Sequence, residues 1–386
     1  MFETRPFVVD WSAAEIERLR ARVADTRLPP AIPTPAGSGW TFGCDADFLR
    51  KVQQYWAHDY DWRAAQAQLN RYPQFITTID GQAIHYLHIR GESEGRRPLL
   101  ITHGWPGSQV EFWDIIEPLA FPSRFGGKAE DAFDLVLPSL PGYGFSGTPA
   151  QPIGQRATAR LWNTLMTEVL GYPRYLAQGG DWGAVVTSWL GMDHGAHVQA
   201  IHLNLLALRH AEPPRDEAEG QWMQASLAAQ QKLGAYSALQ RVRPQSLAWA
   251  TADNPLGQAA WILERFHDWA ELRTRRFEQV FALDRLVTNV MLYAMTGSFA
   301  TSLWYYWAIV PEGMAVLPPG TRCETPTAYT DYSDPVVVAQ PRSRAERAYR
   351  IERWVTAPEG GHFAAMECPA FFVDDLRDWA RPFASL

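Results

Sequence analysis

A chain of 386 residues exceeds one average domain of roughly 100–200 residues, so we expect a large core with added segments. Its net charge of −7, without a basic tract or an alternation of basic and aromatic residues, argues against nucleic acid and an anionic membrane as partners. The 17 Trp, 14 Tyr and 18 Phe residues are unusually many, which suits an apolar ligand pocket as well as a core.

The three cysteines, Cys44, Cys323 and Cys368, are odd in number and far apart, so they form neither a disulfide framework nor a CxxC motif. A reducing cytoplasm is therefore the expected location, and no signal-peptide pattern precedes the first helix. The uncharged span 286–311 is long enough to cross a bilayer, but its hydroxyl and amide side chains favour buried helices of a soluble domain.

Residues 1–80 are expected to form a helical extension that lies across the main domain. Ser12 stands three residues before Glu15, which is the spacing of a capping box at the start of an amphipathic helix. A second helical region, 45–70, carries so many aromatic residues that it must pack against another surface.

The first part of the predicted sheet leads to a glycine-rich turn. A β-hairpin is predicted over 75–89, with Asp80-Gly81 at its turn, and 98–102 reads as a short buried strand. The segment 103–108, His-Gly-Trp-Pro-Gly-Ser, then precedes a helix over 110–119. A turn of this kind presents backbone N–H groups at the sheet edge, as an anion-stabilising hole requires, although a plain turn between strand and helix is an open alternative.

The glycines of 142–147 spell GxGxxG, the dinucleotide-binding fingerprint, after a strand predicted over 133–138. Pro149 and Pro152 follow where that fingerprint needs a helix, and the predicted helix begins only at Thr158, so we do not expect a nucleotide cofactor. No HExxH or other metal-ligand spacing appears, and we expect no metal. The alternation of strands and helices indicates an α/β architecture with a mostly parallel sheet.

Asp181 occupies the central position of Gly-Gly-Asp-Trp-Gly, between a strand that begins at Tyr175 and an apolar helix. This is the layout of a nucleophile elbow, although the same pattern also occurs in ordinary turns. A carboxylate that attacked an acyl ester would form only an anhydride. Attack on a polarised sp³ carbon gives instead an ester that water can cleave, which favours epoxide opening or halide displacement.

An all-helical segment, 208–320, interrupts the α/β pattern and is expected to cover the sheet edge as a lid. After it, a strand predicted over 348–356 leads to Gly360-Gly361-His362, which places His362 in a loop at the same edge. The order of Asp181, an acid and His362 is the order of the triad in α/β hydrolases. The helices predicted in this segment are Glu217–Tyr236, Leu256–Trp269, Phe277–Met295 and Phe299–Val310.

Several motifs along nearly the whole chain resemble the epoxide hydrolases of the α/β-hydrolase superfamily, in particular the microsomal and juvenile-hormone type with an N-terminal extension. The resemblance implies an α/β-hydrolase fold with a helical lid, divided into an N-terminal extension at 1–80, core segments at 81–207 and 321–386, and a lid at 208–320. The matching motifs are Tyr55-Trp56, Asp61-Trp62-Arg63, Leu69-Asn70, Pro73-Gln-Phe75, His103-Gly-Trp-Pro, Gly180-Asp181, Asn289-Val-Met-Leu-Tyr293 and Gly360-Gly-His362-Phe-Ala-Ala.

The resemblance also implies a catalytic triad and an oxyanion hole. Asp181 is the expected nucleophile and His362 the base that activates water. Asp334, 28 residues before His362, fits the acid that orients the base, with Asp331 as the alternative. The oxyanion donors are expected to be the backbone N–H groups of Trp105 and Trp182.

Two lid tyrosines of the family hydrogen-bond the epoxide oxygen. Tyr236 matches the first, and Tyr306 the second, with its neighbour Tyr305 as the alternative. Together with Trp105, the two tyrosines are expected to bind the substrate.

The implied function is hydrolysis of an apolar epoxide to a vicinal diol through an ester on Asp181. A dehalogenase that uses the same Asp–His pair is the main alternative, because Trp105 and Trp182 could bind a halide. An inactive binding protein of the same fold is a further alternative. Without a membrane anchor in this pattern, the chain resembles the soluble members, and association into a homodimer is left open.

Overall fold

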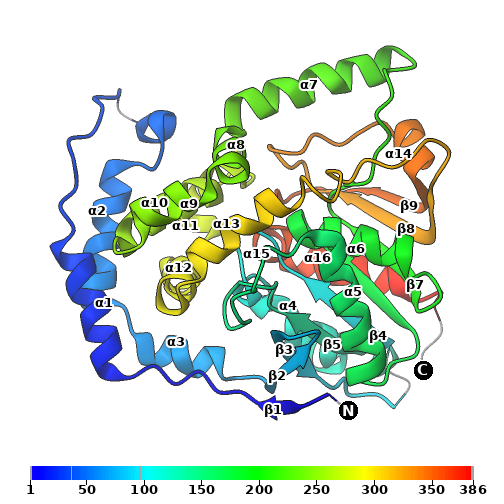
Figure 1. The fold of residues 1–386 in the computed structure, drawn as a ribbon, viewed down its shortest axis with the longest axis horizontal. Coiled ribbons are helices and arrows are strands. Elements are labelled where there is room, and N and C mark those ends of the chain that lie inside the picture. The colour runs from blue at the N-terminus through cyan, green and yellow to red at the C-terminus, as the bar shows by residue number, and fades with distance from the viewer. Residues whose placement is uncertain (1, 36, 95–96, 384–386) are drawn as a thin grey trace.

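The computed structural model describes residues 2–35, 37–94 and 97–383 (Figure 1). Within these residues nine strands form one sheet in the order β1-β2-β3-β5-β4-β6-β7-β8-β9. The strands are β1 (Thr4–Pro6), β2 (Gln74–Ile79), β3 (Gln82–Ile89), β4 (Arg97–Thr102), β5 (Phe133–Pro138), β6 (Tyr175–Gly179), β7 (Val198–Leu203), β8 (Cys323–Asp331) and β9 (Tyr349–Thr356).

The sheet is mostly parallel, as predicted. Strands β4 to β9 pair in parallel with their neighbours, and only the pairs β1–β2, β2–β3 and β3–β5 are antiparallel. The predicted hairpin turn is confirmed: Asp80 and Gly81 both have positive φ, 50° and 78°, which is what a two-residue type I′ turn requires.

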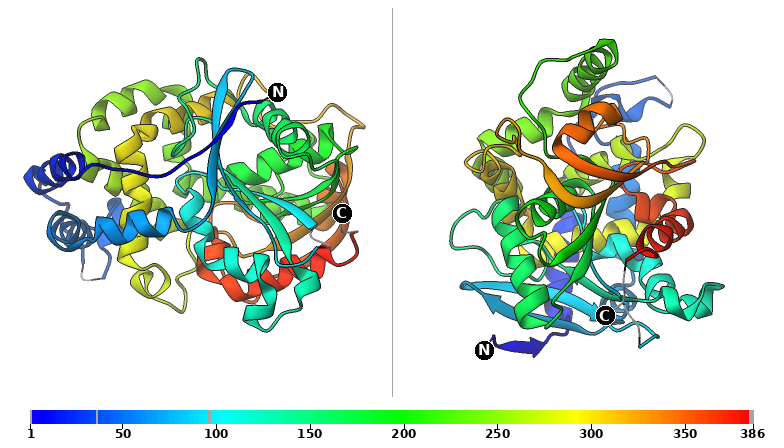
Figure 2. Two further views of the ribbon diagram at one scale, coloured as in Figure 1. Left: turned by 90° about the horizontal axis from the view of Figure 1, so that it is seen from below. Right: turned by 90° about the vertical axis from the view of Figure 1, so that its right-hand side faces the viewer.

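Helices cover both faces of the sheet (Figure 2). On β4, Leu99 and Ile101 point into the core under α4 (Trp113–Ala120) and α16 (Pro369–Ala380), whereas Leu100 packs in the core on the other face of the sheet. This alternation follows from the two-residue period of a strand, and it explains why the buried strands read as continuous apolar runs. The remaining helices of the core are α5 (Gln155–Thr164), α6 (Asp181–Asp193), α14 (Arg342–Ala348) and α15 (Ala364–Glu367).

The glycine-rich loop at 142–147 does not lead into a helix. Helix α5 begins at Gln155, three residues before the predicted start, and a proline-containing loop separates it from the glycines. Gly142 and Gly144 have φ of 77° and 51°, and the Thr301 hydroxyl of the lid donates to the Gly142 carbonyl. The glycines therefore shape a loop that packs against the lid.

The helical lid lies between β7 and β8 in the chain. Its predicted first helix is in fact two helices, because Gly234 follows the end of α7 and glycine is a poor helix former. The sequence prediction also missed α9. The lid helices are α7 (Glu217–Leu233), α8 (Ala235–Val242), α9 (Pro244–Thr251), α10 (Pro255–Trp269), α11 (Phe277–Val280), α12 (Leu283–Thr296) and α13 (Ser298–Ala308).

Gly297 divides the uncharged span 286–311 into α12 and α13. Its φ of 69° is left-handed, which glycine adopts without strain. Most side chains of the two helices are buried, although Trp307 of α13 is exposed. Among the described residues, no helix has the length and hydropathy needed to cross a membrane.

The N-terminal extension (blue in Figure 1) packs against the lid. It was predicted to be helical, but it also contains a strand, β1, which joins the edge of the sheet. The predicted capping box of Ser12 and Glu15 is present in α1 (Ala13–Asp25). After α2 (Ala46–Gln54), the buried Tyr60 hydroxyl lies 2.8 Å from the Thr288 hydroxyl of α12, and α3 (Trp62–Leu69) leads into β2. The boundary at residue 80 stays a prediction; this residue lies in the turn between β2 and β3.

Candidate active site

Asp181 sits on a strained turn between β6 and α6. Its φ of 47° is rare for a residue with a side chain, and glycines on both sides make the turn possible. A Cβ on Gly183 would lie 1.9 Å from the Thr102 carbonyl oxygen, and one on Gly179 would lie 2.2 Å from the Gly183 backbone. The close packing of strand, turn and helix therefore excludes any side chain at these positions, and the carboxyl of Asp181 projects from the turn.

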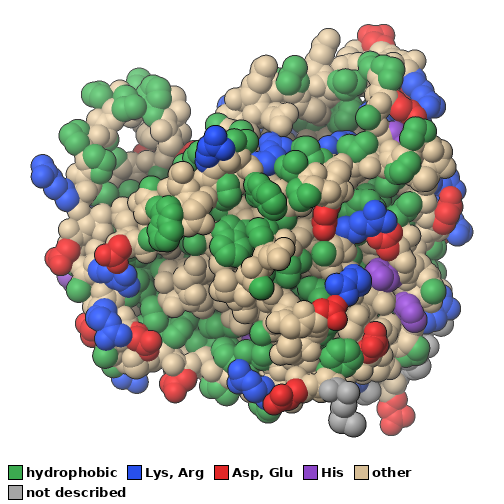
Figure 3. All heavy atoms as spheres, in the orientation of Figure 1, with side chains coloured by type: hydrophobic (Ala, Val, Ile, Leu, Met, Phe, Trp, Pro, Cys, Tyr) green, Lys and Arg blue, Asp and Glu red, His purple; other side chains and the backbone are tan. Residues whose placement is uncertain are grey.

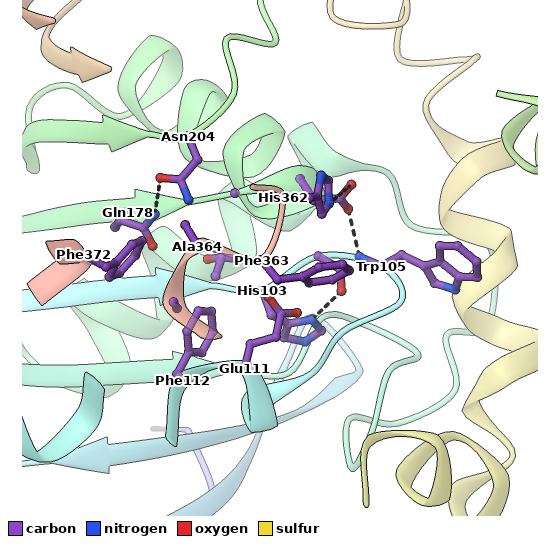
Figure 4. Close-up of a pocket in the computed structure, with 15 residues that line it drawn as sticks. His103, Trp105, Glu111, Phe112, Gln178, Asn204, His362, Phe363, Ala364 and Phe372 are labelled. Atoms are coloured by element: carbon purple, nitrogen blue, oxygen red, sulfur yellow. Dashed lines mark hydrogen bonds and ion pairs between the residues drawn. The ribbon is translucent and has the colours of Figure 1, made fainter. Parts of the chain in front are cut away.

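The backbone of Trp105 holds one oxygen of this carboxylate. The Trp105 N–H donates to Asp181 Oδ1 at 2.8 Å (Figure 4), so Oδ1 lies where an oxyanion would be stabilised. Trp182 was predicted as the second donor. It follows Asp181 in the first turn of α6, and the role of its backbone N–H stays a prediction.

His362 bridges two carboxylates. Its Nε2 lies 3.3 Å from Asp181 Oδ2, and its Nδ1 lies 2.7 Å from Asp334 Oδ2. Burial alone would lower the pKa of His362, but the charges of Asp334 and Asp181 outweigh it and raise that pKa well above its usual value. The structure therefore places a strongly basic imidazole beside Asp181.

Asp334 rather than Asp331 reaches the imidazole. The other oxygen of Asp334 accepts from the backbone N–H groups of Val336, at 2.7 Å, and Val337, at 3.2 Å, which fix the carboxylate in place. Asp331 ends β8 and accepts from the backbone N–H of Ser333 in a local turn.

Tyr236 and Tyr306, from lid helices α8 and α13, lie together opposite the elbow. Their ring centroids are 5.8 Å apart; Tyr236 stacks on Trp105 at 5.5 Å, and Tyr306 meets the edge of Trp182 at 4.7 Å. Burial, with the nearby Asp181, raises the pKa of both phenols above the usual value, so both remain proton donors near neutral pH. Tyr305 points elsewhere, and its hydroxyl donates to Thr158 of α5 at 2.8 Å.

Comparisons with known proteins agree with this geometry. The family model described as "Epoxide hydrolase N terminus" matches residues 4–112, and the model "alpha/beta hydrolase fold" matches residues 97–278. Epoxide hydrolase 1 of Oryctolagus cuniculus is 32% identical, over 96% of this chain and 87% of that protein. The chain belongs to the epoxide hydrolase family.

Solved structures of this family share the fold over nearly the whole chain. The juvenile hormone epoxide hydrolase of Bombyx mori is 27% identical, with a TM-score of 0.87 over 99% of this chain and 95% of that one. The Aspergillus niger epoxide hydrolase is 28% identical, with a TM-score of 0.84 over 98% and 96%. The predicted α/β-hydrolase fold is therefore confirmed.

The sequence identified Asn289 and Tyr293 as part of a motif of the epoxide hydrolase family, but it predicted no role for them. In the structure, the Asn289 amide donates to the Pro106 carbonyl at 2.8 Å, and the Tyr293 hydroxyl donates to the Gly107 carbonyl at 2.6 Å. Both residues lie on α12, so the lid holds the loop that carries the Trp105 N–H. The spacing of four residues places them on one helix face, which is the signal that could have revealed this role.

Two buried residues, one of them in the predicted His103-Gly-Trp-Pro turn, support the site through contacts that were not predicted. His103 Nε2 accepts from the Leu140 N–H at 3.2 Å, and its Nδ1 lies 2.9 Å from the Gly104 carbonyl. Burial lowers the pKa of His103 to about 4, so it is neutral and fixes the loop without adding charge. Trp269 of the lid packs against the His362 ring at 4.7 Å, and its carbonyl accepts from the His362 backbone N–H at 3.1 Å. No sequence signal distinguished Trp269 from the other tryptophans.

In this member of the epoxide hydrolase family, a cavity of about 440 Å³ extends from the two phenols. Most of its lining is apolar, which matches the expectation drawn from the aromatic composition. In the described part of the chain, no group of three or more His, Cys, Asp or Glu side chains could hold a metal ion.

Proposed function

We propose that the protein hydrolyses an apolar epoxide to a vicinal diol through a covalent ester on Asp181. One observation carries this proposal: the Asp181 carboxylate lies between a basic imidazole and a buried pair of phenols. A carboxylate nucleophile needs an acid for the ring oxygen and a base for water, and these groups supply both.

In the first half-reaction the epoxide oxygen accepts hydrogen bonds from Tyr236 and Tyr306. Oδ2 of Asp181, the oxygen that Trp105 does not hold, attacks a ring carbon. The bond between that carbon and the ring oxygen breaks, and one phenol protonates the alkoxide. The products are an alkyl ester of Asp181 and a phenolate.

In the second half-reaction His362 takes a proton from water, and the resulting hydroxide attacks the ester carbon of Asp181. Negative charge develops on Oδ1, where the Trp105 N–H donates, a contact worth about 3 kcal/mol by comparison with other oxyanion holes. Collapse breaks the bond to the substrate oxygen, which takes the proton from His362. The proton left on Asp181 restores the phenol, so one water is added overall.

Trapping the ester tests this mechanism. We expect His362→Gln to accumulate an alkyl-enzyme when mixed with styrene oxide, visible as added mass on the peptide that contains Asp181, whereas Asp181→Ala forms no adduct. A wild-type single turnover in ¹⁸O water should place the label on Asp181 before it appears in the diol. Label that enters the diol directly, with no adduct in the His362 variant, would disprove the covalent route.

Dehalogenation by the same Asp–His pair is the second candidate. The indole N–H groups of Trp105 and Trp182 are buried and make no hydrogen bond to the described residues, so they could bind a leaving halide. The two phenols and the family membership favour the epoxide instead. Measuring halide release from a haloalkane beside diol formation from an epoxide of similar size distinguishes the two.

A further inference from the structure

The cavity that leads to the phenols contains two cations and no acid. Arg209 and Arg241 line it, and none of the described lining residues is Asp or Glu. Arg209 donates to the Ala207 carbonyl at 3.4 Å, and neither guanidinium makes an ion pair with a described carboxylate. In a protein whose acids outnumber its bases by 42 to 35, two such cations in one apolar cavity point to an anionic ligand.

The exposure of the lining residues shows which end of the cavity is buried and which is open. Tyr236 and Tyr306 are 7% and 3% exposed, whereas Arg241 is half-buried and Arg209 is exposed, so the phenols lie at the inner end and the guanidinium groups at the outer end. Tyr236 and Arg241 are five residues apart on α8, or about 7.5 Å along the helix axis. Figure 3 shows blue basic side chains among green hydrophobic ones below α7.

We propose that the preferred substrates are amphipathic epoxides that carry a carboxylate several bonds from the ring, with the carboxylate bound by Arg209 and Arg241. The apolar wall between the two ends fits the hydrocarbon that joins ring and carboxylate. This inference rests on the proposed epoxide hydrolysis and specifies its substrate class.

Comparing an epoxy carboxylic acid of medium chain length with its methyl ester tests the substrate class. We expect kcat/KM for the acid to exceed that for the ester by about tenfold in wild type. The ratio should approach one in the double variant Arg209→Gln, Arg241→Gln, because kcat/KM for the acid falls more than kcat/KM for the ester. Arg18→Gln, an exposed arginine outside the cavity lining, removes the same kind of charge and should leave the ratio intact.

Equal kcat/KM for acid and ester in wild type, or a preference that survives the double variant, would overturn the substrate class alone. Styrene oxide serves as the reference for the basic activity. If styrene oxide, the acid and the ester all fail to give diol, the proposed function fails as well, so the two failures are distinguishable.

A second cavity, of about 20 Å³, carries an independent inference. It lies beside the triad and is lined by Asp181, His362, Glu111 and Gln178 among others (Figure 4). This volume holds about one water molecule. Gln178 is 1% exposed, and its Oε1 makes no hydrogen bond to any described residue, as an unpartnered acceptor facing a water site would.

Glu111 is placed at this cavity by a glycine. Its Oε1 occupies the space where Gly107 would carry a side chain, and a Cβ there would lie 1.4 Å from that oxygen. The Ser108 backbone N–H is a hydrogen-bond partner of this carboxyl, which also lies close to Asp181 and His362. Burial, opposed by His362 and reinforced by Asp181, raises the pKa of Glu111 to about 8, so it is protonated near neutral pH and adds no second negative charge.

We infer that Glu111 is a positioning residue that, with Gln178, holds the water which His362 activates. Its carboxyl can donate to the water or accept from it, and Gln178 Oε1 accepts the second hydrogen. A water held in this way stands ready beside the ester carbon of Asp181 after alkylation.

Separating the two half-reactions tests this role. In Glu111→Ala we expect ester hydrolysis, and with it kcat, to fall roughly tenfold to a hundredfold, with a parallel fall in KM so that kcat/KM, which reports alkylation, stays unchanged. The alkyl-enzyme should accumulate, as seen by mass. Glu111→Gln should retain most of the activity because an amide also holds water, and Gly107→Ala, which displaces the carboxyl, should behave like Glu111→Ala.

An equal fall in kcat and kcat/KM without ester accumulation would mean that Glu111 is merely structural and would overturn the inference. If His362→Gln traps the ester while Glu111→Ala does not, only the role of Glu111 is disproved. If neither traps it, the covalent mechanism itself is wrong.

Discussion

The side-chain amide of Asn289, on lid helix α12, donates to the carbonyl oxygen of Pro106 at 2.8 Å. The same side chain accepts from the Ser108 hydroxyl at 2.7 Å. These buried contacts tie the lid to the loop that presents the Trp105 N–H, so the lid fixes the backbone group that donates to Asp181.

Asn289→Ala should therefore damage both stability and catalysis. Losing two buried hydrogen bonds costs about 1–3 kcal/mol in the free energy of unfolding, and a loosened Trp105 N–H should lower kcat/KM. Asn163→Ala, which removes one partner of the Tyr175 hydroxyl outside the site, is the matched control. It should lower the melting temperature while kcat/KM remains that of wild type; an equal loss of kcat/KM in both variants would contradict the role of Asn289.

The two adjacent tyrosines of α13 should respond differently to loss of the hydroxyl. Tyr306→Phe removes a donor to the epoxide oxygen and should lower kcat/KM by about tenfold to a hundredfold. Tyr305→Phe removes only the hydrogen bond to Thr158 and should affect thermal stability instead. Steady-state kinetics and thermal unfolding of both variants check this, and the assignment is wrong if Tyr305→Phe shows the larger catalytic loss.

Stability should fall as the pH rises above neutrality. The pKa of His362 is higher in the folded protein than in the unfolded chain, so its ion pairs contribute stability that is complete below the unfolded pKa of 6.5 and is lost as the pH rises through the folded pKa. Burial raises the pKa of Glu367 to about 7 and also raises the pKa of Glu111. Stability therefore also falls as these two carboxyl groups lose their protons with rising pH.

Chemical denaturation between about pH 6 and pH 9 measures this slope. We expect Asp334→Asn to make it shallower, because the largest charge that raises the pKa of His362 is gone. Parallel slopes for wild type and Asp334→Asn would show that His362 does not titrate as described.

The elbow leaves no room for a side chain at Gly183. Gly183→Ala places a Cβ 1.9 Å from the Thr102 carbonyl and should destabilise the fold by about 3 kcal/mol or more. Gly220→Ala, on α7 with no heavy atom within 4 Å of the new Cβ, is the control and should stabilise by up to about 1 kcal/mol. Thermal unfolding compares the two, and similar melting temperatures would contradict the packing argument.

The sequence predicted the features that depend on only a few neighbouring residues. The glycine spacing around Asp181 predicted the elbow because the constraint that demands glycine acts within a few residues. The hairpin at Asp80-Gly81 and the capping box at Ser12 were predicted for the same reason. The sequence prediction carried one helix past Gly234, where the structure has α7 and α8. One glycine in a helical pattern does not tell whether the helix bends or ends.

The sequence by itself thus determined most of the central strands and the glycine-flanked turn that carries the Asp181 carboxylate, since these follow from short-range sterics and periodicity. The tertiary structure alone decided that Asp334 rather than Asp331 meets His362, that Tyr306 rather than Tyr305 faces the elbow, and that Glu111 reaches the water-sized cavity. Neighbouring residues of one type have the same local pattern, and only packing between distant segments determines which of them enters the site.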